Sequence, residues 1–207
     1  IFAEAKRVLK PEGSIFVNIG DSFDAKQTVV KDDKRNEPQY DAQPKSLVGV
    51  PARFQIAMIE AGWICREDFV WAKENPAPEG SVTDRATKAY EHVFRFVQQR
   101  DYQSADGGPD YNVLEVGKST TGAADTAPMP KALPETLIQS VLTEDDTGVV
   151  LDMFAGSGTV LEAAADLGHD YIGFEINGET AATARETLSK YARQSNSLTG
   201  QVSINSF

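Results

Sequence analysis

The sequence predicts an α/β fold organised around one βαβ unit near the end of the chain. The observations behind this prediction are two short apolar runs, a glycine turn after the first run, and helical periodicity between the two. A strand over residues 149–151 ends in Asp152 and is followed by the turn Gly156-Ser157-Gly158 and by a helix over residues 159–167. A second strand, over residues 171–174, ends in Glu175. This order places a nucleotide-type crevice at the carboxyl edge of the strands.

The composition is that of one ordinary domain. The 207 residues are 41% hydrophobic, which is enough for a real core. No apolar run approaches the roughly 18 residues of a membrane span, and no secretory signal is visible. A single cysteine rules out a disulfide framework, and with only two histidines we expect no metal site. A cytoplasmic protein that does not contact membranes is therefore expected.

The net charge of −11 bears on any nucleic-acid function, because DNA binding normally requires a basic surface. Two interpretations stay open. The basic residues are concentrated on one face, or the host, a prokaryotic or virus-infected cell, is salt-adapted and the whole surface is acidic.

Helices and strands alternate along the first half of the chain. Lys10-Pro11-Glu12-Gly13 ends the first amphipathic helix, and Pro51 lies in the first turn of the second. The strands are apolar runs, and the last of them has apolar residues on both of its faces. The predicted helices are residues 1–9 and 51–61, and the predicted strands are residues 14–19, 63–71 and 90–98.

The second half begins with a long segment that has little periodicity. A short helix with proline at its start precedes the βαβ unit, and a longer helix follows it. The polar end of the chain is expected to fray. The aperiodic segment is residues 100–130, the short helix residues 134–143, the longer helix residues 179–191 and the polar end residues 194–207.

The glycine turn first suggests a dinucleotide, but the G-x-G-x-x-G fingerprint needs a third glycine where this chain has Leu161. A pyrophosphate also favours backbone N–H groups and not a carboxylate such as Asp152 beside the turn. S-adenosylmethionine has no phosphate and carries a cationic sulfonium. Glu175, nineteen positions past Gly156, can hold its ribose hydroxyls. The alternative is a structural turn, with Asp152 as a helix cap and Glu175 as a solvated strand end.

Two motifs in this unit carry a resemblance to a known family. The run from Asp152 to Gly158, DMFAGSG, resembles the D-P-F-x-G-S-G cofactor motif of DNA amino-methyltransferases, with Met153 in place of the usual proline. Phe174-Glu175-Ile176-Asn177 is similar to the acidic second motif of that family. Further similar segments are residues 7–22, 47–63, 70–79 and 90–96. The resemblance covers most of residues 1–191.

The order of these segments, with the catalytic half first, resembles the permuted members of the family. The resemblance implies a Rossmann-like S-adenosylmethionine-dependent methyltransferase fold. Residues 1–193 would form one DNA methylase domain, followed by a polar tail over residues 194–207. Within the domain, the catalytic half would be residues 1–99, a variable loop residues 100–130, and the cofactor half residues 131–193.

The implied activity is site-specific transfer of a methyl group from S-adenosylmethionine to an exocyclic amine in double-stranded DNA. The amine is N6 of adenine or N4 of cytosine, on a base flipped out of the duplex. Two alternatives stay open: a non-catalytic remnant that binds the cofactor or DNA, and a methyltransferase acting on RNA, protein or a small molecule. The target base, the recognition sequence, the oligomeric state and the presence of a restriction endonuclease counterpart also stay open.

The family holds the target amine with a tetrapeptide of the form (Asp/Ser/Asn)-Pro-Pro-(Tyr/Phe/Trp), which these 207 residues do not contain. The nearest strings, Asn75-Pro76-Ala77-Pro78 and Gly108-Pro109-Asp110-Tyr111, lack the Pro-Pro core. Catalytic residues are therefore not assigned. We expect a fold that is incomplete at the N-terminus, lacks its catalytic strand and is inactive alone. A degenerate protein is the other account.

The expected cofactor contacts come from both motifs and from two places outside them. Pro134 lies where the family contacts the methionine end of the cofactor, although a helix start explains this proline equally well. Asp21 follows the strand of residues 14–19, taken as parallel in type. The full set is Asp152, Phe154, Gly156, Ser157, Gly158, Glu175, Asn177, Pro134 and Asp21.

Several basic residues are candidate contacts for DNA phosphates, namely Arg85, Lys88, Lys26, Lys31, Lys34 and Arg35. Taken one at a time, each is better explained as a solvated surface charge.

Overall fold

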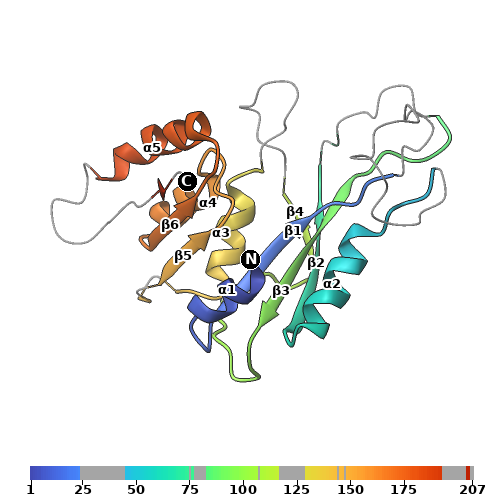
Figure 1. Cartoon of the computed structure of the whole chain (residues 1–207), viewed down its shortest axis with the longest axis horizontal. Coiled ribbons are helices and arrows are strands. Elements are labelled where there is room, and N and C mark those ends of the chain that lie inside the picture. The colour runs from blue at the N-terminus through green and yellow to red at the C-terminus, as the bar shows by residue number, and fades with distance from the viewer. Residues whose placement is uncertain are drawn as a thin grey trace. The chain divides into compact units, whose positions relative to one another are not determined.

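The chain folds into two compact units, which are described separately below. The computed structural model describes residues 1–23, 45–74, 76, 83–106, 108–116, 129–143, 145–146, 148–192 and 204–205. The first unit comprises residues 1–72 and 79–102, and the second comprises residues 73–78 and 103–207 (Figure 1). Lys26, Lys31, Lys34 and Arg35 lie outside the described residues.

The first unit is an antiparallel sheet with helices on one face. Its elements are α1 (Phe2–Val8), β1 (Ser14–Ile19), α2 (Val50–Glu60), β2 (Ile64–Ala72) and β3 (Tyr90–Val97). Strand β3 lies between β1 and β2 and pairs antiparallel with both. The sequence predictions for these elements are confirmed to within one residue at each end.

The helical face of this sheet holds the core of the first unit. Phe94 and Phe96 alternate along β3 and are fully buried against α2. Phe54 of α2 meets Phe2 and Phe96 edge to face, with ring centroids 5.2 and 6.1 Å apart. Aromatic pairs of this geometry add stabilisation beyond the area that they bury. These contacts fix α1 and α2 on the same face.

The opposite face of β3 is also buried, and it contains an arginine. Arg95 is only 4% exposed. Its Nη1 donates to Glu67 Oε2 at 3.0 Å and its Nε donates to Ser14 Oγ at 3.1 Å. The guanidinium also lies near the rings of Phe16 and Tyr102. A buried charge is tolerated where it is paired and hydrogen-bonded in this way.

The second unit contains a parallel sheet and three helices that pack beside it. The strands of this sheet are β5 (Val149–Asp152), β6 (Asp170–Phe174) and β7 (Ile204–Asn205), and the helices are α3 (Ala132–Gln139), α4 (Thr159–Asp166) and α5 (Gly178–Ala192). The short strand β4 (Val113–Glu115) is not part of the parallel sheet. The βαβ unit predicted from the sequence is confirmed as β5, α4 and β6, with β5 parallel to β6. The tail also contributes an element, because β7 pairs parallel to β6.

Helix α3 differs from the prediction at both ends. It begins at Ala132, two residues before Pro134, and ends at Gln139. The proline therefore lies within the first turn, where the backbone N–H has no intrahelical acceptor and its loss costs nothing. Pro134 is buried there with Leu133 and Leu137.

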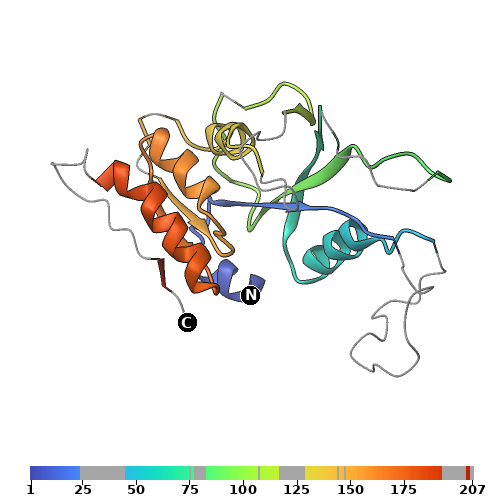
Figure 2. The same cartoon turned by 90° about the horizontal axis from the view of Figure 1, so that it is seen from above.

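Helices α4 and α5 lie side by side against one face of the β5–β6 pair (Figure 2). The buried residues between them are mostly small: Ala155, Leu161, Ala181, Ala184 and Leu188. On the other face of the pair, Val149, Leu151 and Ile172 stay 56%, 37% and 36% exposed. The α4–α5 side is thus the packed side of this sheet.

Gly173 allows this close packing, and its replacement by alanine is expected to destabilise the second unit. A Cβ at this position would lie 2.4 Å from Leu161 Cδ1 and 3.1 Å from Ala155 Cβ. Leu161 is fully buried, so a shift of its side chain would disturb the packing around it. We expect a loss of about 1–3 kcal/mol in the free energy of unfolding, measured by chemical denaturation. Gly178→Ala is the matched control, since nothing lies within 4 Å of its Cβ position; equal losses in both variants would contradict the packing argument.

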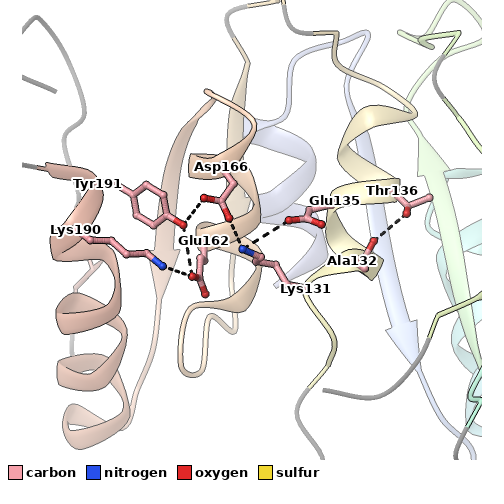
Figure 3. Close-up of polar contacts among 8 residues, drawn as sticks. All are labelled: Lys131, Ala132, Glu135, Thr136, Glu162, Asp166, Lys190 and Tyr191. Carbon is pink, nitrogen blue, oxygen red and sulfur yellow. Dashed lines mark hydrogen bonds and ion pairs between the residues drawn. The ribbon is translucent and has the colours of Figure 1, made fainter. Parts of the chain in front are cut away.

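A network of charged side chains joins α3, α4 and α5 at the surface (Figure 3). Lys131 bonds to Asp166, and Lys190 donates to Glu162 at 2.5 Å. The Tyr191 hydroxyl donates to Asp166 at 2.5 Å. Partial burial and the hydrogen bond to Asp166 raise the pKa of Tyr191, so its proton stays in place. The network links three helices that the sequence places far apart.

In the part of the chain that the structure describes, no helix has the length and apolar character needed to cross a membrane.

Candidate functional site

The glycine turn between β5 and α4 has a backbone shape that requires glycine. Gly156 and Gly158 have φ angles of +53° and +93°, in the left-handed region. A Cβ on Gly158 would also lie 3.2 Å from Ala184 Cβ, so α5 leaves no room for a side chain. The Ala155 amide donates to the Phe174 carbonyl at 2.9 Å, which ties the turn to the end of β6.

Two carboxylates hold this turn. Asp152 Oδ1 accepts from the Phe154 amide at 2.9 Å. Glu175 accepts from two amides: Gly156 N donates to Oε2 at 2.9 Å, and Asn177 N donates to Oε1 at 2.7 Å. Glu175 is therefore neither a free strand end nor fully solvated. Asp152 binds an amide two residues ahead in the turn and does not cap α4, whose N-cap residue, Gly158, has no side chain.

The two acids also interact electrostatically. Burial is the main cause that raises the pKa of Asp152, the charge of Glu175 raises it further, and the hydrogen bond from Phe154 opposes both. Negative charge at this turn is thus held at a cost. A cationic ligand beside Asp152 would remove that cost, whereas a phosphate would increase it.

The raised pKa of Asp152 gives a pH-dependent prediction. An acid whose pKa is raised by folding stabilises the native state below its unfolded pKa, and this contribution is lost as pH rises through the folded pKa. Asp152→Asn keeps an oxygen for the Phe154 amide but carries no charge. We expect the variant to be more stable than the unmodified protein at neutral pH, and the difference to vanish below pH 3.8. Urea denaturation across this range measures it; a difference independent of pH would contradict the prediction.

Two apolar side chains beside the turn face solvent. Phe154 is 66% exposed and Ile176 is 84% exposed. Ile176 is not among the contacts predicted from the sequence. The signal was available, because an apolar residue directly after a strand-ending acid has no core to enter. Both side chains offer apolar surface that a flat ring of a ligand could cover.

The remaining predicted residues of the second motif and of α3 have structural roles. Asn177 Oδ1 accepts from the Glu179 and Thr180 amides, both at 3.0 Å, and so caps α5. Ser157 is exposed at the tip of the turn, and Pro134 is buried in α3. Cofactor contacts by these residues stay predictions.

Asp21 belongs to the first unit, and its carboxylate binds backbone. Its Oδ1 accepts from the Ser22, Gly49 and Val50 amides at 2.9 to 3.0 Å, which fixes the start of α2. The interpretation of the preceding strand as parallel in type is not supported, because β1 pairs antiparallel with its described partner β3. A cofactor contact by Asp21 stays a prediction.

No group of three or more His, Cys, Asp or Glu side chains within the described residues could hold a metal ion. The site thus offers a glycine turn, two carboxylates and exposed apolar surface. This set suits a phosphate-free cofactor that has a ribose and a positive charge.

A βαβ unit with this glycine turn and acid pair is typical of Rossmann-like methyltransferases, and comparison with known proteins identifies the family. A family model described as DNA methylase, covering the N6 and N4 enzymes, matches residues 1–186. The chain belongs to this family, whose members are DNA methyltransferases that use S-adenosylmethionine.

Similar proteins agree with this assignment. The chain is 34% identical to the type II methyltransferase M.XycI of Xanthomonas campestris pv. cyanopsidis, over 91% of this chain and 69% of that protein. It is also 34% identical to M.Cfr9I of Citrobacter freundii, over 86% and 66%. The fold matches the solved PvuII cytosine-N4-specific DNA methyltransferase at TM-score 0.69 and 24% identity, over 97% of this chain and 76% of that one. It also matches the S-adenosylmethionine complex of TTHA0409 from Thermus thermophilus, at TM-score 0.66 and 21% identity, over 99% and 79%.

Proposed function

We propose that the turn formed by Asp152, Gly156, Ser157, Gly158 and Glu175 is the S-adenosylmethionine site of this DNA methyltransferase. The observation that carries the proposal is the position of Glu175. It accepts from the Gly156 and Asn177 amides, so it fixes the turn from the end of β6. Each carboxylate oxygen has a second lone pair, and those two lone pairs are suited to the two ribose hydroxyls.

The remaining contacts with the cofactor are of two kinds, charged and apolar. Asp152 supplies negative charge near the turn, which favours the positive groups of the methionine end. Phe154 and Ile176, both exposed, supply apolar surface for the adenine ring. Asn177 positions the cofactor indirectly, because it caps α5 and so holds the segment after Glu175.

When bound, S-adenosylmethionine supplies an activated methyl group that an amine can attack directly. The residues of this chain bind and orient the donor so that its methyl faces the acceptor. Orientation of this kind accounts for a large part of the rate enhancement in transfer between two bound molecules. The acceptor is the exocyclic amine of a flipped adenine or cytosine in double-stranded DNA.

The acceptor tetrapeptide of the family is not among the 207 residues, and M.XycI and M.Cfr9I are longer than the part that this chain matches. We propose that the tetrapeptide is contributed by sequence outside these residues in the working enzyme. Because these two relatives are named type II methyltransferases, we also propose a restriction endonuclease counterpart that reads the same DNA site.

Two measurements test the proposed function. Calorimetric titration of the 207-residue chain with S-adenosylmethionine is expected to show one site per chain; an absence of binding would overturn the cofactor assignment. A version extended to include the tetrapeptide is then incubated with duplex DNA and radiolabelled S-adenosylmethionine. Labelled N6-methyladenine or N4-methylcytosine is expected after digestion to nucleosides. Binding without transfer by the extended protein would favour the non-catalytic alternative.

A further inference from the structure

A cluster of basic side chains surrounds Phe23 at the end of β1. We call it the Phe23 cluster; it consists of Phe23, Lys45, Asp84, Arg85 and Lys88. The Arg85 guanidinium lies over the Phe23 ring, with Cζ 3.8 Å from its centroid, and the Lys88 ammonium lies 5.7 Å from the same centroid. Lys45 pairs with Asp84 at 2.7 Å, next to Arg85 in sequence.

The cluster carries positive charge in a chain that is acidic as a whole. Its three cations and one carboxylate leave an excess of two positive charges, whereas the chain has a net charge of −11. Asp21 lies beside the cluster, and its carboxylate, which accepts from the amides that begin α2, lowers this excess to one positive charge. Lys88 instead donates to the main-chain carbonyl of Asp21 at 2.7 Å.

The side chains of the cluster are held in place without any ligand. A free lysine or arginine side chain loses rotamer entropy when it is fixed. Here the Phe23 ring holds Arg85, and the carbonyl of Asp21 holds Lys88. The Arg85 and Lys88 charges both lie close to the Phe23 ring, so they are no further apart than about 10 Å. This is the Debye length at 0.1 M salt. Two held cations this close attract a polyanion more strongly than two mobile ones.

We propose that the Phe23 cluster is a docking point for the phosphate backbone of the DNA substrate; this rests on the proposed function. A duplex carries one negative charge per about 1.7 Å of its axis, so adjacent phosphates can meet both cations. Arg85 also donates from Nη1 to the Ala86 carbonyl at 3.3 Å, so the guanidinium is held by a hydrogen bond as well as by the ring. The Phe23 face is occupied by Arg85 and is not offered to a base, so the cluster contacts phosphate and does not read sequence.

The test measures DNA affinity as a function of salt. The double variant Arg85→Gln with Lys88→Gln is compared with Arg7→Gln with Lys10→Gln, which removes the same charges from the exposed end of α1. Binding of a fluorescent duplex is followed by anisotropy. Loss of two phosphate contacts is expected to reduce the slope of log K against log salt by about 1.8. At 0.1 M salt this is about a 60-fold loss of affinity, if the two affinities converge at 1 M salt.

Equal slopes in the two double variants would overturn the proposal, as would failure of the unmodified chain to bind the duplex. Arg85→Lys keeps the charge and is expected to retain most of the slope, whereas Phe23→Leu is expected to lower affinity with the charges intact. A single-stranded RNA that binds more tightly than the duplex would also overturn it. Calorimetry with S-adenosylmethionine on each variant separates the two proposals. If the variants bind S-adenosylmethionine normally and their DNA affinity is unchanged, only the proposal for the Phe23 cluster is contradicted. If the unmodified chain does not bind S-adenosylmethionine, the proposed function is contradicted.

Discussion

Replacement of Glu175 by alanine is expected to weaken S-adenosylmethionine binding at least about a hundredfold. The substitution removes the proposed acceptor for the ribose hydroxyls and leaves the Gly156 and Asn177 amides without their partner. Hydrogen bonds to a charged group contribute about 1.5–3 kcal/mol each, and about 1.4 kcal/mol is a factor of ten in affinity. Two lost bonds to the ribose therefore account for the expected change, which calorimetric titration measures.

Glu179→Ala is the matched control for this prediction. Glu179 carries the same charge and lies in the first turn of α5, four residues after Glu175. We expect its alanine variant to bind S-adenosylmethionine within about twofold of the unmodified chain, since surface substitutions away from a site change free energies by about 0.5 kcal/mol or less. A thermal melt of each variant checks that it is folded. If both variants bind equally well, Glu175 does not hold the cofactor.

Glu67→Ala is expected to cause a large loss of stability in the first unit. Glu67 accepts from Arg95 at 3.0 Å, and the Arg95 side chain is 4% exposed. Removal of one partner leaves a buried charge uncompensated, which costs about 3–5 kcal/mol. Because the Glu67 side chain is 34% exposed, we expect the lower end, about 3 kcal/mol.

An exposed Arg–Glu pair elsewhere in the chain serves as the comparison for the Arg95–Glu67 pair. Arg7 and Glu4 make an ion pair at 2.8 Å, but both side chains are at least 70% exposed. The N–O distances of the two pairs are similar, but their burial differs strongly. Glu4→Ala is therefore expected to cost at most about 0.5 kcal/mol, as exposed helix pairs do. Chemical denaturation of both variants measures the two losses; similar losses would show that burial does not set the strength of the Arg95 pair.

Most of the fold follows from local signals in the sequence. The ends of α2, β5 and α4 are marked by Pro51, Asp152 and Gly168 in the same way that such residues mark element ends in general. The glycine turn and its acids could be predicted for the same reason, since Asp152 binds an amide two residues away.

Contacts between distant segments account for what the sequence did not show. Asp21 has the type and position of a ligand-binding acid, but Gly49, 28 residues later, brings the start of α2 to its carboxylate. Asn177 could have been predicted as a cap, because asparagine before Gly-Glu-Thr is a common helix start. The Phe23 cluster joins three segments separated by long stretches of chain, so no short window along the sequence contains it.

The acid pair at the glycine turn has a consequence for turnover. On the proposed function, methyl transfer would convert the cationic sulfonium of the donor into a neutral thioether, so the product would lack the positive charge that Asp152 is proposed to attract. The ribose that Glu175 is proposed to hold is the same in donor and product. Asp152 would therefore favour fresh donor over the spent molecule, whereas Glu175 would hold both alike.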